Sequence, residues 1–165
     1  MTKKQMEALK KILASLPDDS RASYQEIAKY AISLGYMPSL KGARKDYVDF
    51  TKSKVKRTIM KINTDPKFPP SLAMKFYAVP SYPEIFQKAV DDRLTAWNKY
   101  KYEARCFGCG KCDGTEGYTV PLPEGKQGFL CGFGLLPLPQ IKTEHVQEIN
   151  EALKTQDEFF MSQIK

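Results

Sequence analysis

The chain has 165 residues, of which 42% are hydrophobic and 27% charged, and its formal net charge is +7. A chain of this length fits one domain, here residues 1–165, and can bury a sizeable core without disulfides. The most apolar segment, Gly128 to Pro139, is short and broken by glycine and proline, so no membrane span is expected. Because an amphipathic pattern follows Met1, we expect no signal peptide and a cytoplasmic location.

The positive charge is concentrated in the first part of the chain. Residues 1–66 contain 14 lysines and arginines against 7 acidic residues, whereas residues 67–165 contain 12 of each kind. Such an asymmetry favours an anionic partner, for example a nucleic acid. A solvated basic surface without a partner is the alternative interpretation.

Two helices are predicted at the N-terminus. Thr2 and Gln5 form a capping box before the first helix, which ends before a turn at residues 18–20. Ser23 and Glu26 form a second capping box and predict the start of the second helix.

The second helix is expected to end at Gly35, in the left-handed conformation that glycine tolerates. The following segment, Leu40–Ser53, is basic and has no clean hydrophobic period, so it is predicted to be a loop with one short helix. Residues 1–53 therefore form a helical, basic N-terminal part.

Residues 54–165 are predicted to contain hairpins that alternate with helices. We expect strands at Arg57–Ile62 and Leu72–Val79, a helix with an apolar face from Phe86 to Trp97, strands at Tyr118–Leu122 and Gln127–Phe133, and a final helix capped by Thr143. The resulting order, ααββα-ββα with a cysteine loop before the second hairpin, predicts an α+β fold with antiparallel strands.

All four cysteines lie between residues 106 and 131, with the spacing C-x2-C-x2-C-x18-C. Clustered thiols in a reducing compartment favour a metal site over disulfides. The predicted ligands of a Zn²⁺ ion are Cys106, Cys109, Cys112 and Cys131. Because four thiolates complete a tetrahedral site and leave no position for substrate, the zinc is predicted to be structural.

Two alternatives to zinc stay open. The first three cysteines match the start of the bacterial ferredoxin run, although Cys131 comes much later and precedes Gly132 instead of a proline. The cysteines can also carry no ion, as free thiols, as thiol-redox groups or as a disulfide.

Several short motifs follow one another from Leu72 to Phe160: Lys-Phe-Tyr, a Tyr-Pro helix start, C-x2-C-G-x-C, a strand ending in Cys-Gly and a helix closing near Gln-Asp-Glu-Phe. In this combination the chain resembles a group of small uncharacterised bacterial proteins. The resemblance implies that the motifs belong together, and it implies no activity.

The segment from Ser23 to Gly35 resembles the first helix and turn of helix-turn-helix DNA-binding domains. This implies a recognition helix after it, although the segment Gly35–Gly42 is longer than the usual turn. The candidate phosphate contacts are Arg44, Lys45, Lys52, Lys54, Lys56 and Arg57.

Enzymatic activity has no positive support beyond the thiols. No nucleophile elbow, phosphate-binding glycine loop or metalloprotease motif is present, and the only histidine, His145, is expected to be a solvated helix residue. The sequence therefore predicts a non-catalytic binding or regulatory module with a structural zinc site. A DNA-binding regulator and a thiol-redox or iron–sulfur protein are the alternatives.

Overall fold

A computed structural model describes residues 1–40, 46–79, 83–99, 118–121, 127–131, 134–138 and 140–164. The elements are α1 (Lys3–Ala14), α2 (Asp18–Ser33), β1 (Met37–Ser39), β2 (Tyr47–Lys52), β3 (Arg57–Asn63), β4 (Ser71–Met74), α3 (Glu84–Lys99), β5 (Tyr118–Pro121), β6 (Gln127–Leu130), β7 (Leu136–Pro137), the short 3-10 helix η2 (Thr143–His145) and α4 (Val146–Ser162). None of these helices is long and apolar enough to span a membrane.

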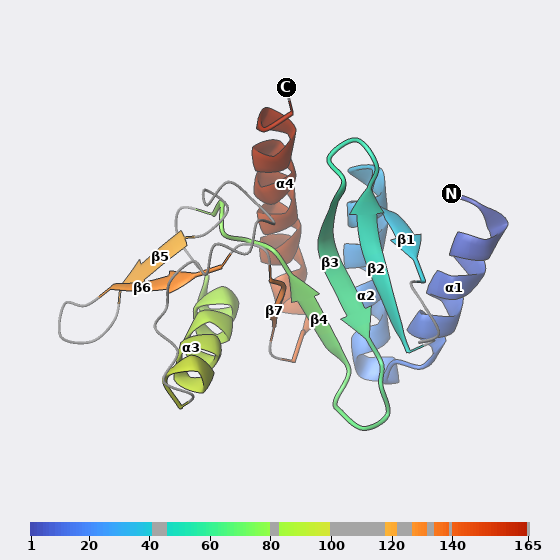
Figure 1. Cartoon of the computed structure of the whole chain (residues 1–165). Helices are drawn as coiled ribbons and strands as arrows, with labels where there is room; N and C mark the ends of the chain where they lie inside the picture. Colours follow the sequence, from blue (N-terminus) through green and yellow to red (C-terminus); the bar gives the residue numbers. More distant parts are fainter. Residues whose placement is uncertain are drawn as a thin grey trace.

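Five strands form one antiparallel sheet in the order β1-β2-β3-β4-β7, and β5 pairs with β6 in a separate two-stranded sheet. Helices α2 and α4 lie side by side behind the five-stranded sheet, and α1 lies beside β1 at its edge (Figure 1). The predicted α+β class, with two N-terminal helices before the strands, is confirmed.

The core forms between the five-stranded sheet and the helices that cover it. Alternate residues of the three central strands are fully buried: Val48, Phe50, Met60, Ile62, Leu72 and Met74. The register brings Met60 opposite both Phe50 and Met74, so these side chains form one continuous apolar layer. Ile27 of α2 and Ile149 of α4 are equally buried in the same cluster.

The prediction of a loop with a short helix over Leu40–Ser53 is wrong for residues 46–53, and residues 41–45 lie outside the described part of the chain. Tyr47–Lys52 is strand β2, which pairs with β1 on one side and β3 on the other. Val48 and Phe50 are fully buried beneath the helices and form the inward face of the strand. Residues 1–53, predicted to be helical, therefore also contribute strands β1 and β2 to the sheet. Strand β2 pairs with β3, which belongs to residues 54–165.

The predicted starts of two helices also need correction. Helix α2 begins at Asp18 directly after Pro17, and Ser23 is a buried residue inside it and not its cap. Pro17 is the N-cap residue, with an extended ψ angle of 145°, and its missing N–H costs the helix no hydrogen bond there. The acidic first turn, Asp18 and Asp19, suits the positive end of the helix dipole. At the last helix, Thr143 begins η2, and α4 itself begins at Val146.

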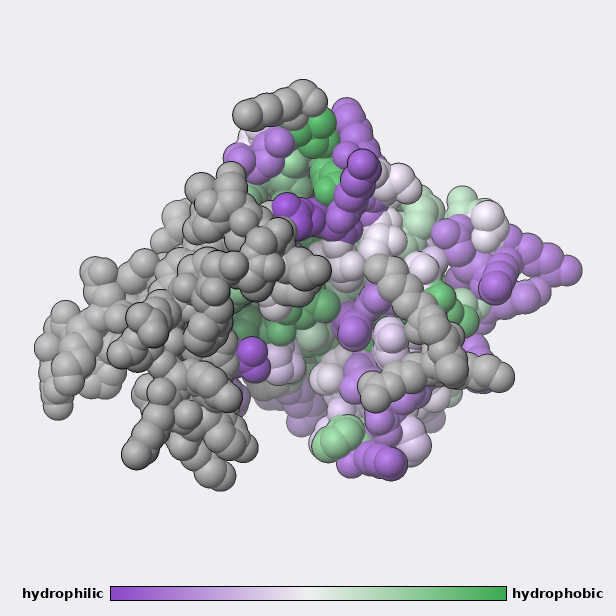
Figure 2. Space-filling model, in the orientation of Figure 1, coloured by the Kyte–Doolittle hydropathy of each residue, from purple (hydrophilic) through white to green (hydrophobic). Residues whose placement is uncertain are grey.

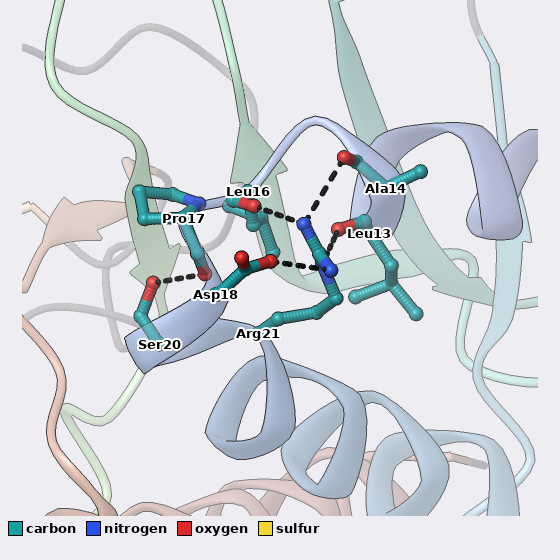
Figure 3. A network of polar contacts seen from close by, with 7 residues as sticks. All are labelled: Leu13, Ala14, Leu16, Pro17, Asp18, Ser20 and Arg21. Atoms are coloured by element: carbon teal, nitrogen blue, oxygen red, sulfur yellow. Dashed lines mark hydrogen bonds and ion pairs between the residues drawn. The ribbon is translucent and has the colours of Figure 1, made fainter.

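Arg21 of α2 joins the first two helices (Figure 3). Its guanidinium donates hydrogen bonds to the carbonyl oxygens of Leu13, Ala14 and Leu16 at 3.0, 3.4 and 2.8 Å, and pairs with Asp18 at 2.7 Å. The last carbonyls of a helix have no partner within the helix, and a cation is favourable beside them. Arg21 therefore caps the end of α1 and fixes it against the start of α2.

Candidate functional site

The turn between β2 and β3 carries the most concentrated basic charge among the described residues. Lys52, the last residue of β2, lies opposite Arg57, the first residue of β3, in the strand register, and residues 53–56 connect the two strands. Lys54 and Lys56 are exposed, and Arg57 is half-buried. We refer to residues 53–57 as the basic turn.

The backbone of the basic turn holds one residue in an unfavourable conformation. Lys56 has a φ angle of +53°, and it is the only non-glycine residue with a positive φ in the described part of the chain. Its N–H donates a hydrogen bond to the carbonyl oxygen of Lys52 at 2.9 Å, which closes the turn. Left-handed backbone costs a residue with a Cβ atom roughly 1–2 kcal/mol, so glycine would be the more stable choice here.

A pocket of about 220 Å³ lies between the basic turn and the C-terminal end of α4. It is lined by residues 54–57 on one side and by Phe159, Phe160, Gln163 and Ile164 on the other. Figure 2 shows apolar atoms flanked by hydrophilic side chains at this place, at the top of the molecule. The site thus combines an apolar lining with cations beside it.

The aromatic residues of this pocket are fixed by their neighbours. The Phe159 ring packs edge-on against Tyr77, with ring centroids 5.5 Å apart, and lies 6.2 Å from the ring of Phe160. Phe160 is buried, whereas Phe159 is half-buried and borders the pocket. The pocket therefore presents a ring that is already held in position.

Lys52 is largely buried, unlike the exposed Lys54 and Lys56. Its ammonium donates hydrogen bonds to both carboxylate oxygens of Asp157, at 2.7 and 2.9 Å, and the two side chains are only 15% and 12% exposed. The Tyr36 hydroxyl donates to the same carboxylate at 2.9 Å. Burial, helped by this hydrogen bond, raises the pKa of Tyr36 well above its ordinary value. The contacts of Asp157 therefore connect α4 both to β2, through Lys52, and to the residue before β1, Tyr36.

The six predicted phosphate contacts therefore have different positions. Arg44 and Lys45 lie outside the described residues, and Lys52 is held by Asp157. Lys54, Lys56 and Arg57 come together on the basic turn. The implied recognition helix is not present within residues 46–63, which form the hairpin of β2 and β3 instead.

Of the four predicted zinc ligands, Cys131 is the one that the described residues include. It follows β6 directly and is half-buried. The other three predicted ligands, Cys106, Cys109 and Cys112, lie outside the described residues. The hairpin predicted around this position is present as β5 and β6, which pair from Tyr118–Leu130 to Pro121–Gln127.

His145 was expected to be solvated, but it has a local structural contact. Its Nδ1 accepts a hydrogen bond from the N–H of Lys142 at 3.1 Å, and its side chain is 23% exposed. Nε2 lies 3.7 Å from a carboxylate oxygen of Glu144. This arrangement caps η2 before α4 begins.

Comparison with protein-family models, curated proteins and solved structures finds no significant match to this chain. The resemblance to small bacterial proteins stays a prediction.

Proposed function

We propose that the protein is a non-catalytic module that binds nucleic acid through the basic turn, with its C-terminal hairpin held by a structural zinc ion. The single observation behind the binding function is the meeting of Lys54, Lys56 and Arg57 on one turn beside a pocket. Lysine and arginine side chains that converge in this way neutralise phosphates and release counterions, which is the main source of affinity for nucleic acids.

The charge distribution around the turn supports this proposal. Within the described residues, no carboxylate forms an ion pair with Lys54 or Lys56. The two ammonium groups are therefore available to an external anion. The strained backbone at Lys56 is consistent with a functional position, since residues held in such conformations cluster at active and binding sites.

The test compares two double variants that remove the same charge. Lys54→Gln/Lys56→Gln removes two cations from the basic turn, and Lys3→Gln/Lys4→Gln removes two exposed cations from the start of α1. Affinity for a fluorescent oligonucleotide is measured by anisotropy at fixed salt. We expect the turn variant to bind several-fold more weakly and the α1 variant to bind like the wild type. Equal losses in both variants would mean that overall charge, and not the turn, causes binding.

The zinc proposal rests on the four-cysteine spacing together with the isolation of the second hairpin. β5 and β6 have four residues each, and no other described strand pairs with them. A two-stranded hairpin of this size is only marginally stable by itself in water. A Zn²⁺ ion bound by Cys131 at the end of β6 and by the three preceding cysteines would supply the missing stabilisation, because metal binding contributes directly to folding.

Elemental analysis of protein purified without added metal tests the zinc proposal. We expect one zinc per chain, and we expect Cys131→Ser and Cys109→Ser to lose both the metal and thermal stability. Iron with visible absorbance, or a metal-free protein whose stability is unchanged in both variants, would overturn it. A stability loss that appears only after treatment with a reductant would indicate a disulfide.

A further inference from the structure

The size of the pocket beside the basic turn limits what can enter it. Its volume is about 220 Å³, below the roughly 300 Å³ at which pockets for drug-sized ligands begin. It therefore suits one ring system and not a complete large ligand. The apolar part of its lining includes Val55 and Ile164, which favour a group that is itself largely apolar.

The chemical character of the lining favours a ring that is attached to an anion. Phe159 presents a half-buried ring that Tyr77 and Phe160 already hold in place. The cations Lys54, Lys56 and Arg57 all lie on the other side, in the turn. Aromatic rings beside a basic groove are the arrangement by which proteins bind single-stranded nucleic acids, with bases stacked on the rings and phosphates held by the cations.

Double-stranded nucleic acid does not fit this arrangement. Its bases are paired and stacked, and bringing one out of the duplex costs a few kcal/mol. A single strand offers its bases without that cost. The pocket therefore distinguishes the two forms, whereas the lysines alone would bind both.

We propose that this pocket receives one unpaired base of a single-stranded nucleic acid, stacked on Phe159, while Lys54 and Lys56 hold the adjacent phosphates. The inference rests on the proposed nucleic-acid binding at the basic turn. It adds to that function a preference for single strands and a residue that provides it.

The experiment compares a thymidine oligonucleotide with an abasic oligonucleotide of the same length, and therefore the same phosphates without bases. We expect the wild type to bind the thymidine strand at least about fivefold more tightly, since stacking of one base contributes that much or more. Phe159→Leu should remove this preference and leave affinity for the abasic strand unchanged. Phe68→Leu is the matched control, because Phe68 is 64% exposed in the loop between β3 and β4, at the opposite end of the hairpins (Figure 1).

Photocrosslinking of the wild type with an iodouracil-substituted strand gives a second measurement that needs no variant. We expect the crosslink on the peptide that contains Phe159. A crosslink confined to other peptides, or equal binding of the thymidine and abasic strands, overturns the inference and leaves nucleic-acid binding intact. Failure of both strands to bind would contradict the proposed function itself. Equally strong competition by an acidic polypeptide would indicate a protein partner, and it would overturn both proposals.

Discussion

The different positions of Lys52 and Lys54 lead to opposite expectations for two otherwise identical substitutions. Lys52→Met should lower stability strongly and leave nucleic-acid affinity unchanged, because its ammonium is bound by Asp157. Lys54→Met should lower affinity and leave stability nearly unchanged, because Lys54 is exposed. Methionine keeps most of the apolar stem, which for Lys52 passes Gly35.

The expected size of the stability loss follows from the geometry of the buried pair. At the observed 2.7 and 2.9 Å, and with an effective dielectric constant of about 20, the attraction between the two charges is about 6 kcal/mol. Part of this is offset by the cost of removing both groups from water. Taking away one partner leaves a buried carboxylate whose described remaining partner is the Tyr36 hydroxyl. Such a change costs about 3–5 kcal/mol, whereas removal of an exposed lysine changes stability by about 0.5 kcal/mol or less.

Urea denaturation followed by far-ultraviolet circular dichroism measures the free energy of unfolding of the wild type and both variants. Binding of the folded proteins to a labelled oligonucleotide is measured in parallel. A loss below about 1 kcal/mol for Lys52→Met, the range of exposed ion pairs, would refute the structural role of the pair. A loss of affinity in Lys52→Met equal to that in Lys54→Met would refute the distinction between the two lysines.

Two further predictions concern the strained turn and a buried tyrosine. Lys56→Gly should raise the free energy of unfolding by about 1 kcal/mol, because it relieves the positive φ, and should at the same time weaken nucleic-acid binding; a less stable variant in urea denaturation would contradict this. Burial raises the pKa of Tyr24 from 10.0 to about 12, against a smaller opposing effect of a hydrogen bond with the Leu72 backbone, and the folded protein therefore favours the protonated hydroxyl. This pKa shift contributes about 3 kcal/mol to the free energy of unfolding; the contribution is complete below pH 10 and is lost as the pH rises to about 12. The free energy of unfolding of Tyr24→Phe should therefore fall less steeply over that range than that of the wild type. Equal slopes for the two proteins would count against this role of Tyr24.

The sequence predicts the features of the fold that depend on neighbouring residues. The capping box of Thr2 and Gln5 is present at α1, and Gly35 has the expected left-handed conformation, with a φ angle of +91°. β2 was missed because the charges around it obscured a real alternation of Val48 and Phe50 with polar residues. β7 has only two residues and pairs with β4, far away in the sequence, so no local pattern indicates it.

The candidate site shows the same division between local and distant information. Lys54 and Lys56 could be selected from the local density of basic residues, and both are exposed. The same density could not show that Lys52 is paired with Asp157, 105 residues away. The pocket was not predictable either, because α4 brings Phe159 to the turn only in the folded chain. The sequence signals of α4, its apolar spacing and Thr143 near its start, do not indicate what the end of the helix contacts.

The most direct test of the central claim is the salt dependence of nucleic-acid binding. The logarithm of the binding constant falls linearly with the logarithm of salt concentration, with a slope of about −0.9 for each phosphate neutralised on duplex DNA and about −0.7 on a single strand. We expect Lys54→Gln/Lys56→Gln to reduce the magnitude of that slope by about 1.4 on a single strand, which corresponds to two lost phosphate contacts. A slope equal to that of the wild type would contradict the proposal that the basic turn binds nucleic acid.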